Sequence, residues 1–179
     1  MKNVTLLGID LAKNVFQLHG VDDKRNPVLR KRLTRSKLME FIVKLQTCTI
    51  VMEACSEANY WCRKFKAMGH EVKLISPQFV KPFVKTNKND ANDSEAICEA
   101  ASRPSMRYVS PKSVEQEGIQ AVHRVRSRLV AERIALVNQI RGLLAEFGIV
   151  VPQGINKICK ALPEIITSDT IISKNQIKA

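Results

Sequence analysis

The stretch VTLLGIDLAKNVFQLHG, residues 4–20, decides the fold class of this chain. Its first part, Val4 to Ile9, is a short apolar run that ends at Asp10, which is typical of a buried strand. Residues 14–19 alternate in polarity and predict a second strand. A turn-forming cluster rich in Asp, Asn and Pro leads to a third strand over residues 28–33, whose charges indicate a sheet edge. Three strands joined by short turns predict an antiparallel meander.

After the third strand the hydrophobic period lengthens to three or four residues, which is the spacing of amphipathic helices. The predicted elements are, in order, a helix within residues 38–45, a strand at 49–52, a helix at 60–68, a strand at 72–75 and a helix at 90–102. The two later strands are each reached through a helix, so they should run parallel to the first strand. The sequence therefore predicts an α/β fold with a mixed five-stranded sheet in the order β-β-β-α-β-α-β-α.

Beyond residue 105 the pattern becomes wholly helical. Ser113 and Gln116 form a capping box, and an apolar stripe with steps of three and four residues then continues to Phe147. We expect three regions: an α/β domain over 1–105, a long helical arm over 106–148, and a short helix with an irregular tail over 149–179. The arm is long enough to form half of a coiled coil, so we expect a homo-oligomer through this helix.

The charge of the chain indicates a polyanionic partner. Its 179 residues contain 29 Lys and Arg against 17 Asp and Glu, a net charge of +12. Such an excess attracts phosphate backbones, although a basic protein without a nucleic-acid partner is the alternative. The apolar content of 45% excludes a disordered chain, and no apolar run approaches the roughly 18 residues that a membrane span requires. Five cysteines without a C-x-x-C pair, and no signal peptide, favour a reducing cytoplasm.

Four carboxylates occupy positions that suit a metal site. Asp10 and Glu53 each follow an apolar strand directly, and Asp90 and Asp93 lie three residues apart at the start of a predicted helix. If the two strands are parallel neighbours, their carboxyl ends meet at one edge of the sheet, which is where α/β folds place their sites. Carboxylates crowded together need cations, and Mg²⁺ or Mn²⁺ suits oxygen ligands best. The alternative is that these residues are turn and helix-end charges without a ligand.

Basic side chains near these carboxylates and on the long helix are candidate nucleic-acid contacts. They are Lys81, Lys85, Lys88, Arg124, Arg126 and Arg128. The lysines precede the paired aspartates on a predicted loop, where they would hold a phosphate backbone near the metal ions. The arginines suit bidentate phosphate contacts, and the alternative is a solvated helix face.

Three segments resemble successive blocks of a known family. They are GIDLAKNVFQLHG (8–20), VMEACSEANYW (51–61) and HEVKLISPQFVKPFVKTNKNDANDSEA (70–96). These blocks resemble the DEDD transposases of bacterial insertion sequences, the group that includes the Piv-type invertases. VKTNKNDANDSEA (84–96) is the most specific of them. The resemblance covers the chain to about residue 165.

The resemblance implies a RuvC-like ribonuclease H fold and a metal-dependent DNA recombinase. The family's four acidic residues correspond to Asp10, Glu53, Asp90 and Asp93, which would bind divalent metal for DNA strand cleavage and exchange. The resemblance also implies a structured guide RNA that pairs with donor and target DNA.

Family members carry a second, C-terminal domain with a Gly-rich segment and a nucleophilic serine. The final residues here, SDTIISKNQIKA (168–179), do not resemble that continuation, so we expect a truncated copy. No serine of this chain matches the nucleophile by motif. Two alternatives to a recombinase remain: a non-catalytic, dimerising nucleic-acid-binding remnant, and a resolvase-like nuclease.

Overall fold

A computed structural model describes residues 3–84 and 90–168, with residues 90–92 described by their backbone alone. The chain divides into two compact units, Met1–Ser113 and Val114–Ala179. Among the described residues, the strands all lie in the first unit, and the regular elements of the second unit are helices. The predicted division at residues 105 and 148 stays a prediction.

Six strands form one mixed sheet in the order β3-β2-β1-β4-β5-β6. Their bounds are Leu6–Asp10 (β1), Val15–Val21 (β2), Pro27–Thr34 (β3), Thr49–Glu53 (β4), Glu71–Ile75 (β5) and Tyr108–Val109 (β6). The antiparallel meander β1-β2-β3 and the parallel pairing of β1 with β4 and of β4 with β5 confirm the predicted topology. This strand order is that of the ribonuclease H fold, as predicted. The sheet has one strand more than predicted, because β6 has only two residues and leaves no periodic signal.

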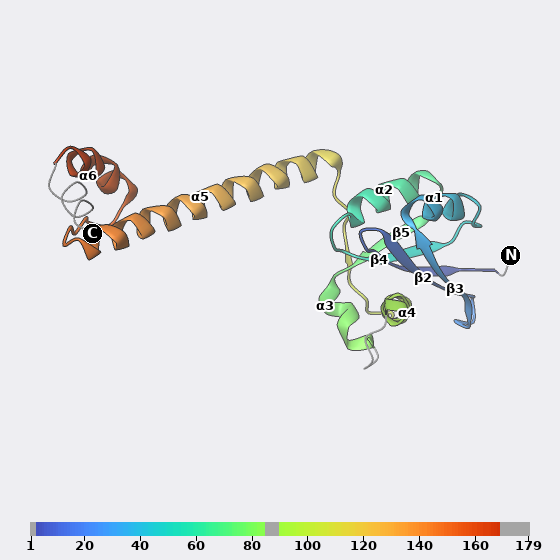
Figure 1. Ribbon diagram of the computed structural model, residues 1–179. Coiled ribbons are helices and arrows are strands. Elements are labelled where there is room, and N and C mark those ends of the chain that lie inside the picture. Colours follow the sequence, from blue (N-terminus) through green and yellow to red (C-terminus); the bar gives the residue numbers. More distant parts are fainter. Residues whose placement is uncertain (1–2, 85–89, 169–179) are drawn as a thin grey trace. The chain divides into compact units, whose positions relative to one another are not determined.

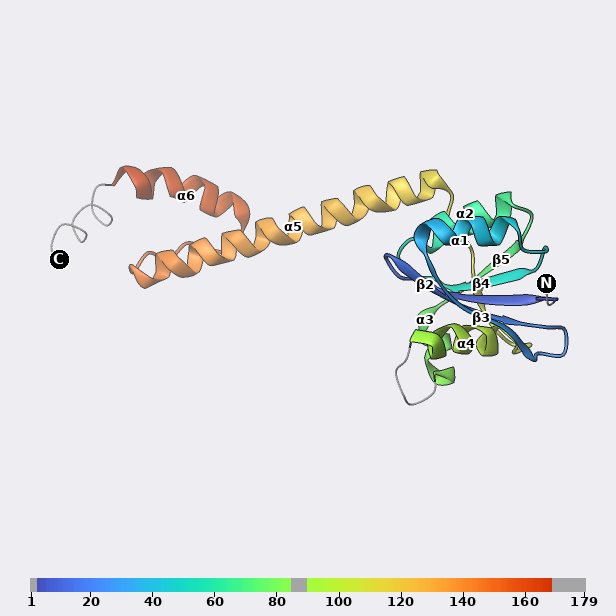
Figure 2. The same ribbon diagram turned by 45° about the vertical axis from the view of Figure 1, so that its right-hand side comes forward.

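Helices cover both faces of this sheet, as Figures 1 and 2 show. In the second view, α1 and α2 lie on one face, and α3 and α4 lie on the other. The helical elements of this unit are α1 (Arg35–Val43), α2 (Ala58–Ala67), α3 (Pro77–Val80), the 3-10 turn η1 (Lys81–Phe83) and α4 (Asp90–Ala101). The larger core, under α1 and α2, is built around the fully buried Trp61 and Phe16. The smaller core, under α4, includes Val51 and Ile97.

The second unit consists of α5 (Val114–Glu146) and α6 (Ile155–Thr167). The predicted long helix is confirmed as α5, and Gly148 follows it at a φ of +77°, a conformation that favours glycine. Val137, Val151 and Ile158 form a small core where α5 and α6 pack together. Neither of these helices, nor any other in the described ranges, is long and apolar enough to cross a membrane.

Candidate active site

The strands β1 and β4 end side by side, each on a carboxylate. Their parallel register pairs Ile9 with Met52, so Asp10 and Glu53 are the next residues along the two strands. Both are half-buried, whereas the residue before each is fully buried. The apolar runs therefore anchor the strands in the core and leave the two carboxylates at its edge. The prediction that Asp10 and Glu53 meet at one edge of the sheet is confirmed.

The helix α4 lies close against β1 because β1 contains Gly8. A Cβ atom at Gly8 would lie 2.6 Å from the carbonyl oxygen of Ser94 and 2.8 Å from Sγ of Cys98. The Cys98 thiol donates a hydrogen bond of 3.1 Å to the carbonyl oxygen of His19 on β2, which holds the helix across both strands. Asp93 directly precedes Ser94, so this close approach fixes the turn of α4 that carries Asp93.

The electrostatics of Glu53 show that three of the predicted carboxylates lie near one another. Burial raises the pKa of Glu53 above its ordinary value, and the negative charges of Asp10 and Asp93 raise this pKa further. The ammonium group of Lys81, on η1, acts in the opposite direction and lowers the pKa of Glu53. The sheet edge therefore concentrates negative charge from β1, β4 and α4, which is partly compensated by one lysine.

The donor set at this edge is chemically suited to hard divalent ions, because carboxylate oxygens are the ligands that Mg²⁺ and Mn²⁺ prefer. A dication would also relieve the mutual repulsion that raises the pKa of Glu53. Among the described side chains, no three His, Cys, Asp or Glu residues are already arranged around one metal position. The backbone of Asp90 begins α4, but its side chain lies outside the described part of the structure.

We predict that Glu53 makes the metal-free protein less stable as the pH rises. Its folded-state pKa is raised above the ordinary value of 4.5, so the folded state binds the proton more tightly than the unfolded state. The stability from protonated Glu53 is therefore fully present below pH 4.5 and is lost as the pH rises through the folded-state pKa. Urea unfolding of the wild type and of Glu53→Gln over this range should show a loss that the variant lacks. Equal pH dependence in both would contradict this prediction.

A cavity of about 440 Å³ adjoins the carboxylate edge. It is lined by the residues that follow the two strands: Leu11, Ala12 and Lys13 after β1, and Cys55, Ser56 and Glu57 after β4. Burial raises the pKa of the Cys55 thiol, and the charges of Glu53 and Asp10 raise it further, so the negative field of the carboxylates reaches this cavity. None of these residues is among the site residues predicted from the sequence.

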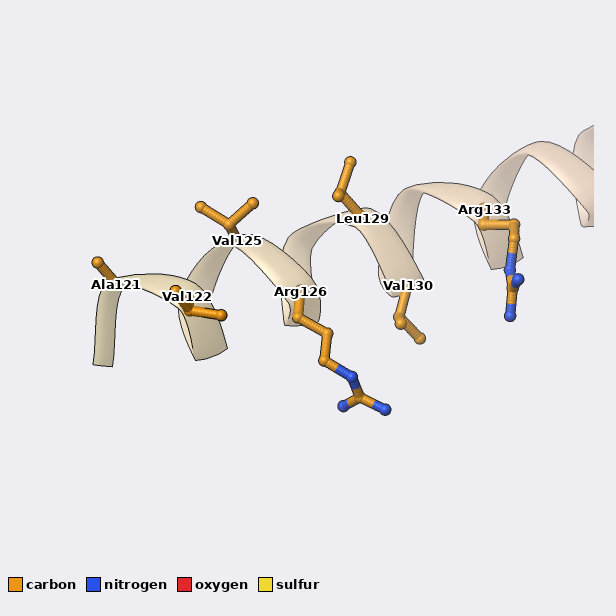
Figure 3. Close-up of a pocket in the computed structure, with 7 residues that line it drawn as sticks. All are labelled: Ala121, Val122, Val125, Arg126, Leu129, Val130 and Arg133. Carbon is orange, nitrogen blue, oxygen red and sulfur yellow. The ribbon is translucent and has the colours of Figure 1, made fainter. Parts of the chain in front are cut away.

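The predicted basic contacts fall into separate parts of the chain. Lys81 is exposed on η1 in the first unit, whereas Lys85 and Lys88 lie outside the described residues. In the second unit the exposed arginines of α5 occupy two sides of the helix, because steps of four and seven residues each return to the same side. Arg124 and Arg128 share one side, and Arg126 lies with Arg133 along an exposed apolar stripe. Figure 3 shows Arg126 and Arg133 projecting from the same side of α5 as Val130.

Two further features of this site were not predicted from the sequence, and only the first of them leaves a signal there. Gly8 interrupts an apolar strand two residues before Asp10, and a glycine inside a strand is a signal of close backbone approach. The ion pair between Arg35 and Glu57, at 2.6 Å, joins residues 22 positions apart and leaves no periodic signal.

Comparisons with known proteins agree on one family. The profile of a family described as transposase, of the DEDD IS110 type, matches residues 7–149. A probable family 20 transposase of Pseudomonas aeruginosa is 57% identical over 148 residues, covering 83% of this chain and 44% of that protein. The transposase for insertion sequence element IS1328 of Yersinia enterocolitica is 52% identical over 155 residues, covering 87% of this chain and 46% of that protein.

The transposase for insertion sequence element IS1111A of Coxiella burnetii is 47% identical over 171 residues, covering 96% of this chain and 47% of that protein. The chain thus spans a little under half the length of these relatives. Among solved structures, this chain is similar to T. thermophilus RuvC in complex with Holliday junction substrate. The TM-score is 0.44 and the sequence identity 11%, and the match covers 60% of this chain and 100% of that chain. The fold described above rests on the strand order of this chain itself.

Proposed function

This chain belongs to the DEDD transposase family of insertion sequences, and from that membership we propose that it contributes the catalytic half of a DNA transposase. In this proposal it binds DNA and takes part in metal-dependent strand cleavage and exchange in the cytoplasm. The observation that supports this most strongly is that the parallel strands β1 and β4 end side by side on Asp10 and Glu53, with Asp93 on α4 near enough for its charge to raise the pKa of Glu53.

We propose that Asp10, Glu53, Asp90 and Asp93 hold Mg²⁺ or Mn²⁺. Divalent ions held by these residues would supply positive charge to activate an attacking oxygen and to stabilise a leaving oxygen at phosphorus. The residues of this chain would position the carboxylates that hold these ions. Strands β1 and β4 fix two carboxylates at neighbouring positions, and Gly8 lets α4 bring Asp93 close to them. Lys81, near Glu53, would then face the phosphate backbone of the DNA.

We further propose that a second copy of the chain covers the apolar stripe of α5. Val122, Val125 and Leu129 lie on this stripe with more than half of their surface exposed. Such an exposed apolar surface is typical of an interaction site, and steps of three and four residues are typical of a coiled-coil seam. By family resemblance, a structured guide RNA is the additional partner.

The binding proposal predicts a steep salt dependence. If Lys81, Lys85, Lys88, Arg124, Arg126 and Arg128 each neutralise one phosphate of duplex DNA, the affinity should fall about 10³-fold between 50 and 200 mM salt. Fluorescence anisotropy with a labelled duplex measures this directly. Arg124→Gln should reduce the logarithmic salt slope by about one, with little effect on sequence preference. Affinity that is unchanged across this salt range would contradict the proposed backbone contacts.

A further inference from the structure

Arg35, the first residue of α1, joins the two loops that follow β1 and β4. Its backbone N–H donates to the carbonyl oxygen of Asn14 at 3.2 Å. Its guanidinium Nη1 donates to the carbonyl oxygen of Lys13 at 3.4 Å and to Oε2 of Glu57 at 2.6 Å. One residue therefore contacts the loop after Asp10 through two backbone carbonyls and the loop after Glu53 through a carboxylate.

Arg35 contacts each loop at the same distance along the chain from the carboxylate that precedes the loop. Asn14 lies four residues after Asp10, and Glu57 lies four residues after Glu53. Lys13 and Glu57 also line the cavity of about 440 Å³ beside the carboxylate edge. Because Arg35 holds both loops at equivalent positions, it limits how far the two strand ends and their carboxylates can separate.

Glu57 has an unusual conformation that matches this role and not a role in capping its own helix. It occupies the N-cap position of α2 with a φ of 68°, in the left-handed region that side-chain-bearing residues rarely adopt. Within the described residues, its side chain makes no capping hydrogen bond to α2. Its carboxylate instead accepts the hydrogen bond from Arg35, which lowers the pKa of Glu57. Strained backbone of this kind is typical of functional sites.

The guanidinium of Arg35 is itself held in place by an aromatic side chain. It lies 5.1 Å from the centre of the Trp61 ring, and Trp61 packs edge-on against Phe16 in the main core. The two ionic side chains remain 43% and 39% exposed, and exposed ion pairs contribute little to folding stability. The main consequence of the arrangement is therefore geometric.

We propose that Arg35 is a positioning residue for the carboxylate site: strands β1 and β4 place Asp10 and Glu53 side by side, and Arg35 keeps the loops that follow them from moving apart, through Glu57 and the backbone of Lys13 and Asn14. This inference rests on the proposed metal-dependent function. Arg35 would act on the metal site through the two loops that it contacts, so its loss is expected to weaken metal binding.

The test is a titration of the metal-free chain with Mn²⁺. The electron paramagnetic resonance signal of free Mn²⁺ reports how much of the ion is bound at each point. Simple Coulomb attraction predicts that removing the positive charge of Arg35 strengthens binding of a cation. The positioning role predicts the opposite: Arg35→Gln should weaken Mn²⁺ affinity about tenfold, the lower end of the range for residues that orient metal ligands. The matched control is Lys37→Ala, which removes one positive charge and the 3.0 Å ion pair with Glu40 from the same helix. This control should bind Mn²⁺ at least as tightly as the wild type.

A second variant separates positioning from folding. Glu57→Gly removes the carboxylate but relieves the left-handed backbone, so its melting temperature without metal should stay close to that of the wild type. Its Mn²⁺ affinity should nevertheless fall about as much as that of Arg35→Gln. Wild-type affinity in either variant, or an equal loss in Lys37→Ala, would overturn the inference. A wild-type chain that binds no Mn²⁺ would instead contradict the proposed function.

Discussion

Asp10→Asn is expected to abolish the rise in melting temperature that Mg²⁺ or Mn²⁺ produces in the wild-type chain. A ligand that binds only the folded state stabilises it by about 2.7 kcal/mol when its concentration is 100 times its Kd. Asparagine keeps the size of Asp10 but removes its negative charge, which raises the pKa of Glu53 on the neighbouring strand β4. The remaining carboxylates should not retain the ion at the same concentration.

Without metal, the same substitution should not lower the stability of the folded chain. The charge of Asp10 raises the pKa of Glu53, so removing it relieves repulsion at neutral pH and should leave the metal-free variant at least as stable as the wild type. Asp23→Asn, at an exposed turn position, is the matched control and should keep the full metal response. Differential scanning calorimetry with and without each ion measures both effects. A wild type that does not respond to either ion would exclude the metal site and leave a nucleic-acid-binding chain.

Gly8→Ala should produce the second large effect. The added Cβ would lie 2.6 Å from the backbone oxygen of Ser94, and a backbone atom cannot rotate away as the end of a long side chain can. The helix α4 must therefore move off β1. We expect a loss of about 1–3 kcal/mol in the free energy of unfolding, the usual range for overpacking. Because α4 carries Asp93, the metal response should weaken as well.

Gly142→Ala is the matched control for this substitution. Gly142 lies within α5, and apart from its chain neighbours and the backbone of its own helix, no described atom comes within 4 Å of the position that its Cβ would take. Alanine in a helix interior is favoured over glycine by up to about 1 kcal/mol, so this variant should be slightly stabilised. Urea denaturation gives both values. Equal stability of Gly8→Ala and the wild type would show that α4 is not held at this distance from β1.

The sequence carried the information for the central sheet because the buried strands are short apolar runs with sharp ends. Asp10 and Glu53 could be predicted as neighbours, since each ends such a run and a helical crossover makes the two strands parallel. The strand β6 was not predicted, because its two residues pair with β5 through backbone hydrogen bonds that no side-chain pattern encodes. The ion pair between Arg35 and Glu57 was not predicted either, because it depends on how α1 and α2 pack on the sheet.

The central position of β1 also has a consequence for synthesis on the ribosome. Its partner β2 follows within a few residues, but the other edge of β1 stays without its partner until β4, which begins at Thr49, has emerged. At roughly 5–20 residues per second, the nascent chain carries this open edge for several seconds. An open edge of an apolar strand can pair with other chains, so co-translational chaperones are expected to associate with this chain during that interval.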